Sequence, residues 1–238
     1  SSVVGLCGGE FLVSQGSEVH WLDTTGALYG YYPLSEDIMR LTLDGTADTL
    51  WASHNDSKIV SQVDLAATAY TMTEHTLSGI VRRTAPATAG KLFVATEQTT
   101  TDTSGSHISL ISNADSAPVT PWELGEYGQR MAYDSLNQQL ILGDANITAF
   151  AFKGGVIVAK PTVSNVNACT GARGEMSVSP DSAHLVYPCV NGNGQGVNMV
   201  DFSPLDLTSS GTYVIGEEIG PRGALYSPDG RFLLATDN

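Results

Sequence analysis

A short apolar run recurs along this chain at an average spacing of about 44 residues, and this repeat constrains the fold more than any other feature. Each run is rich in leucine, valine and alanine, and residues that favour turns lie between successive runs. A repeated unit of this kind buries its apolar residues against neighbouring units. The runs are Phe11–Gln15, Leu50–Asn55, Leu92–Gln98, Leu140–Asn146, Leu185–Asn191 and Phe232–Asn238.

Each unit is predicted to contain four β-strands. In the second unit the strands are expected at Met39–Leu43, Leu50–Ser53, Ile59–Leu65 and Tyr70–Leu77, and Asn55–Ser57 turns the second strand into the third. Helical periodicity is absent. A four-stranded unit of roughly 40–50 residues is typical of a β-propeller blade. We therefore expect an all-β protein, a β-propeller of four-stranded antiparallel blades.

The repeat predicts one propeller domain over residues 1–238, with five complete blades and a partial one. The expected ranges are 1–34, 35–77, 78–124, 125–163, 164–218 and, for the partial blade, 219–238. An open propeller would expose long strand edges. We therefore expect the last blade to be completed, either by polypeptide that continues past Asn238 or by a partner protein, in a ring of six or seven blades.

Three segments resemble a known family. Met176–Asp181 and Leu225–Asn238 resemble the strand–turn–strand signature of YVTN-type and WD-repeat-like β-propellers, and Trp51–Leu65 resembles the following half of the same repeat. The likeness covers nearly the whole chain and implies a fold. It also implies the alternative of an enzyme or enzyme subunit, because YVTN-type propellers resemble lactonases and the large subunits of amine dehydrogenases.

Composition limits the partners. The chain has 11 Lys and Arg against 25 Asp and Glu, a formal net charge of −14. Such a chain is a poor ligand for nucleic acid or for an anionic membrane surface. No apolar run approaches the ~18 residues of a membrane-spanning helix, so we expect neither a nucleic-acid partner nor a membrane span.

The three cysteines give information on the cellular location of the protein. Cys169 and Cys189 flank the first two strands of one blade and are expected to form a disulfide; two separate buried thiols are the alternative. Cys7 is left without a predicted partner. Together with a low lysine content and abundant Ser and Thr, the pairing indicates a periplasmic or secreted protein.

Five of the seven arginines recur at nearly one place in the repeat, 10 to 12 residues before the second strand of their blades. In a propeller this place is the start of the innermost strand, so a ring of guanidinium groups is expected at the channel mouth. Such a ring would suit a small anionic ligand bearing carboxylate or phosphate. The alternative is structural: each arginine pairs with an acidic neighbour and ties blades together. The arginines are Arg40, Arg82, Arg130, Arg173 and Arg222, and the acidic candidates include Asp37, Glu126, Asp134 and Glu175.

No catalytic set, metal site or cofactor is predicted. The histidines occupy different places in different blades, no Cys-x-x-Cys spacing is present, and motifs for nucleophilic serines or phosphate loops are absent. We therefore expect a non-enzymatic, extracytoplasmic β-propeller binding or scaffolding module. The alternative is a propeller enzyme, lactonase-like or similar to a dehydrogenase large subunit, that acts on a carboxylate- or phosphate-bearing substrate.

Overall fold

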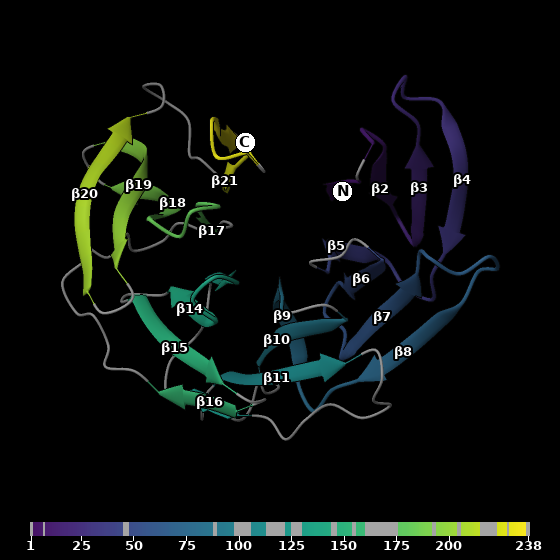
Figure 1. The fold of residues 1–238 in the computed structure, drawn as a ribbon. Helices are drawn as coiled ribbons and strands as arrows, with labels where there is room; N and C mark the ends of the chain where they lie inside the picture. The colour runs from purple at the N-terminus through teal and green to yellow at the C-terminus, as the bar shows by residue number, and fades with distance from the viewer. Residues whose placement is uncertain are drawn as a thin grey trace. The chain divides into compact units, whose positions relative to one another are not determined.

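The computed structural model describes residues 2–6, 8–44, 48–87, 90–97, 106–112, 122–124, 130–143, 147–153, 156–159, 176–191, 194–203, 206–214, 223–227 and 229–236. All regular elements among them are β-strands (Figure 1). The chain divides into two compact units, Ser1–Tyr127 and Gly128–Asn238. No helix in this part of the chain is long and apolar enough to cross a membrane.

The first unit consists of three four-stranded antiparallel sheets, each formed by consecutive strands. Neighbouring strands along the chain pair with one another, so every sheet is a meander. The first sheet contains β1 (Val3–Gly5), β2 (Phe11–Gln15), β3 (Glu18–Leu22) and β4 (Leu28–Pro33). The second contains β5 (Ile38–Leu43), β6 (Thr49–His54), β7 (Ile59–Asp64) and β8 (Met72–Thr76). The third contains β9 (Ile80–Pro86), β10 (Lys91–Glu97), β11 (Ser106–Ser112) and β12 (Trp122–Leu124).

The second unit has two four-stranded sheets and a final sheet that has two strands among the described residues. The fourth sheet contains β13 (Arg130–Asp134), β14 (Gln139–Gly143), β15 (Ile147–Lys153) and β16 (Val156–Ala159). The fifth contains β17 (Ser177–Val178), β18 (His184–Asn191), β19 (Gly194–Ser203) and β20 (Asp206–Val214), and the last contains β21 (Gly223–Tyr226) and β22 (Leu233–Thr236). Further strands beside β22, a ring of six or seven blades and a single domain over the whole chain stay predictions.

The core lies between the sheets of each unit. In the second sheet, the second strand β6 is buried along its whole length, and so is β14 of the fourth sheet. Leu12 of the first sheet packs with Leu50 of the second, and Trp51 of the second packs with Leu92 of the third. In the second sheet the recurring apolar run is therefore the strand that contacts both neighbouring sheets.

Two turns reproduce the signature that carried the family resemblance. In the turn from β17 to β18 the Ser179 Oγ donates a hydrogen bond to Asp181 Oδ1, and the backbone N of His184 donates to Ser179 Oγ. In the turn from β21 to β22, Ser227 and Asp229 repeat the first of these contacts. The serine hydrogen bond lowers the pKa of each aspartate. These local contacts explain why a Ser-Pro-Asp segment ends one strand and starts the next.

His75 on β8 is a buried titratable group that makes the stability of the fold depend on pH. It is 2% exposed, its Nε2 lies 2.8 Å from Gln62 Oε1, and its ring packs on Trp51 at 5.5 Å between centroids. Burial lowers the pKa of His75 below its ordinary value of about 6.5. The folded chain therefore favours the neutral ring.

We expect the free energy of unfolding to be highest above pH ~6.5 and to fall as the pH drops through the lowered pKa of His75, because the unfolded chain binds the proton more readily. Denaturant unfolding of the wild type and of His75→Gln between neutral and acidic pH measures this. The variant should show a shallower decline than the wild type. Equal slopes for the wild type and His75→Gln would contradict this assignment.

Candidate functional site

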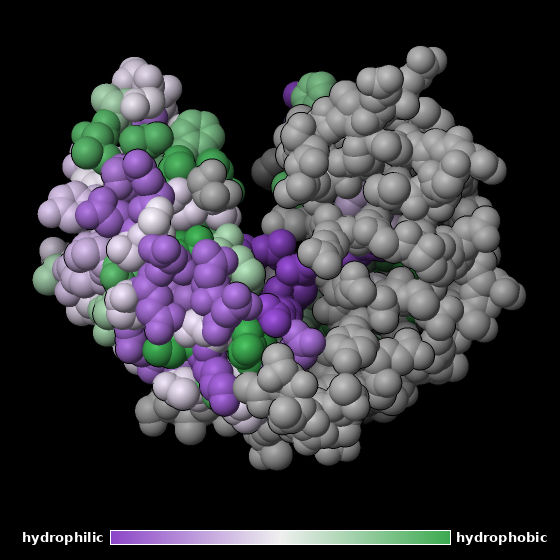
Figure 2. Space-filling view, turned by 180° about the vertical axis from the view of Figure 1, so that it is seen from behind, coloured by the Kyte–Doolittle hydropathy of each residue, from purple (hydrophilic) through white to green (hydrophobic). Residues whose placement is uncertain are grey.

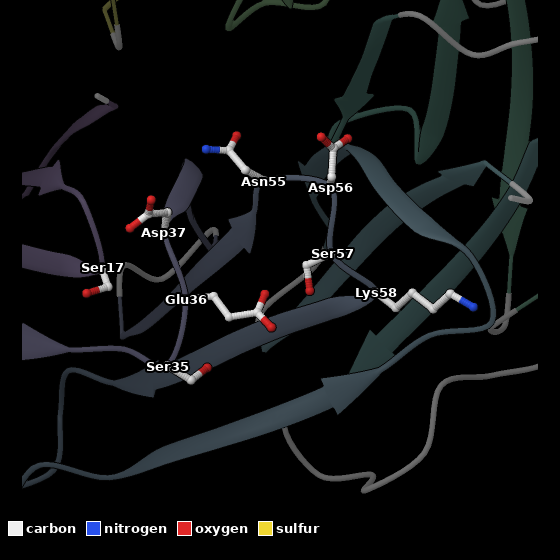
Figure 3. A pocket seen from close by; sticks show the side chains of 8 residues that line it. All are labelled: Ser17, Ser35, Glu36, Asp37, Asn55, Asp56, Ser57 and Lys58. Atoms are coloured by element: carbon white, nitrogen blue, oxygen red, sulfur yellow. The ribbon is translucent and has the colours of Figure 1, made fainter. Parts of the chain in front are cut away.

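A polar cavity of about 680 Å³ lies at one end of the first and second sheets (Figure 3). Three connecting segments form it: the turn between β2 and β3, the link from β4 to β5, and the turn between β6 and β7. The cavity is lined by Ser17, Ser35, Glu36, Asp37, Asn55, Asp56, Ser57 and Lys58. Its size is in the range of small-ligand sites.

Backbone hydrogen bonds hold the three segments together. The backbone N of Ile38 donates to Gly16 O at 2.8 Å, and the backbone N of Asn55 donates to Asp37 O at 3.1 Å. His54, which is fully buried, donates from Nδ1 to Glu36 O at 3.0 Å. The backbone that carries the acidic side chains is therefore fixed by strands on both sides.

The acidic side chains of the cavity differ in their partners. Asp56 has a φ of 49°, in the left-handed region that Asp tolerates, and its carboxylate pairs with Arg82 of the third sheet. Within the described part of the chain, the Glu36 and Asp37 carboxylates have neither a hydrogen bond nor an ion pair. In Figure 3 the Lys58 side chain extends away from both. The cavity thus presents two uncommitted negative charges.

Arg82 joins two sheets beside this cavity. Its Nη1 lies 2.8 Å from Asp56 Oδ1 and its Nε lies 2.6 Å from Glu97 Oε2 on β10. The hydrogen bond that Arg82 donates to the Glu97 carboxylate is the main cause that raises the pKa of Arg82. Two carboxylates therefore neutralise this guanidinium. This is the arrangement expected if the arginine pairs with acidic neighbours and ties adjacent sheets together.

The strand register identifies Arg83, which sequence reasoning missed, as the counterpart of two predicted arginines. Arg40 pairs with Ser53 and Arg130 with Gly143, each opposite the third residue after the leucine that begins the apolar run. In the third sheet the apolar run begins at Leu92, so the equivalent residue is Ala95, and Ala95 pairs with Arg83. Arg82 lies at a shift of the register between β9 and β10. The turn between β9 and β10 is one residue shorter, so counting back from Leu92 reaches Arg82 instead.

The other described arginines of the repeat differ in their burial and contacts. Arg130 is 4% exposed, and its guanidinium lies over the Tyr187 ring of the fifth sheet at 5.4 Å. The Arg83 Nη1 donates to Arg82 O, and Arg40 lies half-buried on β5. Arg173 and Arg222 lie outside the described residues, so a ring of arginines that binds an anion stays a prediction.

The cysteines, possible metal-binding groups and Asp134 complete the set of predicted groups. Cys7 and Cys169 lie outside the described residues, so the pairing of Cys169 with Cys189 stays a prediction. No group of three or more His, Cys, Asp or Glu in the described ranges could hold a metal ion. Asp134, a candidate partner of Arg130, accepts hydrogen bonds from its own turn, and the Ser182 Oγ of the fifth sheet donates to the same carboxylate.

Comparison with known proteins identifies the fold class. No protein-family model and no curated protein matches the chain in sequence. Among solved structures, hydrazine synthase of Kuenenia stuttgartiensis is similar, with 14% identity, a TM-score of 0.74, and coverage of 98% of this chain and 79% of that one. The Cps50 (Swd1) β-propeller domain of Myceliophteria thermophila has 12% identity, a TM-score of 0.76, and coverage of 99% and 79%.

A third similar structure, a Bacteroides fragilis protein provisionally assigned as a 6-phosphogluconolactonase, has 16% identity, a TM-score of 0.69, and coverage of 99% and 76%. At these identities the likeness concerns the fold alone. Together with the four-stranded antiparallel sheets, it confirms the predicted β-propeller fold. Membership of the YVTN branch in particular stays a prediction. The similar structures include enzymes and a propeller domain named without an activity, so the fold by itself assigns no function.

Proposed function

We propose that this chain is a non-enzymatic, extracytoplasmic β-propeller binding module that holds a basic segment of a protein partner in the cavity between its first two sheets. A rigid meander scaffold with its polar side chains on connecting segments suits such a role. The extracytoplasmic part of the proposal rests on the low lysine content and on the predicted Cys169–Cys189 pairing.

One observation carries the choice of a basic ligand: the carboxylates of Glu36 and Asp37 line a concave site without partners in the described part of the chain. Negative charges in a concave site concentrate cations there. The net charge of −14 attracts a basic partner over longer distances. The serine and asparagine side chains of the cavity can accept the remaining hydrogen bonds of an ammonium or guanidinium group.

Isothermal titration calorimetry with two synthetic peptides tests the proposal. One is a capped decapeptide of alternating lysine and glycine, and the other carries glutamate in place of every lysine. We expect the lysine peptide to bind, its affinity to fall with added salt, and the glutamate peptide not to bind. Absence of binding by the lysine peptide at low salt, or equal binding of both peptides, would refute the proposal.

The second candidate is an anionic ligand at the arginines, in a binding module or in an enzyme that acts on a carboxylate- or phosphate-bearing substrate. The shared register of Arg40, Arg83 and Arg130 is the observation in its favour. The contacts of Arg82 favour a structural role instead, because an incoming anion would compete with both Asp56 and Glu97.

Replacing Arg82 with glutamine separates these roles. If Arg82 joins the sheets, the free energy of unfolding drops by about 0.5–1 kcal/mol, a value that allows for solvent screening of a side chain that is 42% exposed. Titration with inorganic phosphate should then give the same result for variant and wild type. Arg231→Gln, which breaks an exposed pair with Asp229, is the control and should change stability less. Loss of phosphate binding in Arg82→Gln, at unchanged stability, would favour the anion site.

A further inference from the structure

The two faces of the first sheet differ sharply in burial. Residues that face the second sheet, such as Leu12 and Val19, are fully buried. The opposite face is exposed and largely apolar, and Figure 2 shows hydrophobic residues at the surface over this sheet, in the upper left. We call this surface the first-sheet face; it comprises Val3 (60% exposed), Phe11 (42%), Glu18, Leu28 (59%) and Tyr31 (60%).

The repeat shows what such a face normally contacts. Phe11 begins the apolar run of β2, as Leu50, Leu92 and Leu185 begin those of β6, β10 and β18. These three leucines are fully buried because each packs against the preceding sheet. Phe11 therefore occupies a position that in those sheets forms a sheet-on-sheet interface. The first-sheet face has the chemistry of such an interface.

The last sheet has an exposed face as well. Ala224 and Tyr226 pack toward Val186 of the fifth sheet. Leu225 points to the opposite face and is 39% exposed, and Phe232, which continues the pairing of β21 with β22, is 59% exposed. Arg231 lies beside it with its guanidinium over the Phe232 ring. This surface, the last-sheet face, consists of Leu225, Arg231 and Phe232.

We propose that these two faces bind each other between copies of the chain, so that the first-sheet face of one copy docks on the last-sheet face of the next. Exposed apolar patches of this kind mark interaction sites, and aligned sheets pack through their apolar faces. Glu18, which pairs with His20, borders one face, and Arg231, which pairs with Asp229, borders the other, so opposite charges meet at the rim of the contact. The contact uses two different surfaces, so it is heterologous, and a pair of copies retains one free face of each kind. The inference is independent of the proposed basic ligand.

Sedimentation velocity and light scattering of the full chain test this contact. The mean mass of the wild type should rise with concentration. Phe11→Glu and Phe232→Glu each destroy one face, so each variant alone should stay monomeric. An equimolar mixture of the two should form a dimer, because one intact face of each kind remains. Leu136→Glu, a change at an exposed leucine of the turn between β13 and β14, should assemble like the wild type.

The charge pair provides a check that does not depend on how well a glutamate is tolerated at either phenylalanine. Glu18→Arg and Arg231→Glu should each weaken assembly several-fold. A mixture of these two variants should restore a dimer, because the introduced arginine of one copy meets the introduced glutamate of the other, and the double variant should assemble for the same reason. A wild type that stays monomeric at every concentration would overturn the proposal. So would a single phenylalanine variant that self-associates, since that result indicates an isologous contact, or a mixture that remains monomeric.

Discussion

Replacing Asp44 with alanine should lower the free energy of unfolding by about 2–4 kcal/mol, the largest effect on stability that we expect from one polar side chain. Asp44 is buried in the turn between β5 and β6, and its Oδ1 accepts hydrogen bonds from the backbone N of Asp48 and Thr49. Its Oδ2 accepts a hydrogen bond of 2.9 Å from Gly90 N in the third sheet. Alanine would leave these donors without an acceptor and loosen the contact between two sheets.

Urea unfolding of three variants checks this expectation. Asp44→Asn keeps one acceptor oxygen and should lose less stability than Asp44→Ala. Asp48→Ala, at an exposed position of the same turn whose backbone N makes the contact, should stay within about 0.5 kcal/mol of the wild type. A loss for Asp44→Ala as small as that for Asp48→Ala would show that the carboxylate does not join the sheets.

The second large effect concerns binding. Neutralising the cavity with Glu36→Gln and Asp37→Asn should raise the Kd of the lysine peptide about tenfold, because two carboxylate–ammonium contacts are each worth about 0.5–1 kcal/mol at a partly exposed site. Neither change should affect folding strongly, since the backbone of both residues, not their carboxylates, holds the three segments together. Calorimetric titration measures the change.

A control variant separates the local effect from that of total charge. Asp48→Asn with Asp64→Asn removes the same net charge from exposed positions at the other end of the second sheet, outside the cavity. Its Kd should stay within about twofold of the wild type, because exposed charges at a distance are screened by salt. Equal losses in both double variants would mean that the peptide responds to total charge alone.

The fold was predictable from the sequence because each unit repeats one local pattern. The apolar run from Leu50 and the turn Asn55–Ser57 define a second strand and its hairpin without reference to the rest of the chain. The exact register was harder to predict. The turn between β9 and β10 is one residue shorter than the turn between β5 and β6, so the residue equivalent to Arg40 is Arg83 and not Arg82. Only the backbone pairing reveals this.

The cavity could not be predicted in the same way. Its lining comes from three segments between Ser17 and Lys58 that differ from repeat to repeat. From the sequence, Asp37 is predicted only as a partner that neutralises an arginine. Asp56 is paired with a side chain of the next sheet, whereas Asp37 has no such partner among the residues that the structure describes, and the difference depends on which side chain of the next sheet reaches each carboxylate. That information is tertiary, and no local pattern carries it.

The most direct test of the account is an experimental structure of the chain with the lysine peptide bound. We predict one lysine Nζ within about 4 Å of the Glu36 carboxylate and another within about 4 Å of the Asp37 carboxylate, with the peptide in contact with the turn between β6 and β7. A peptide bound elsewhere on the surface, with the cavity vacant, would contradict the proposed binding site.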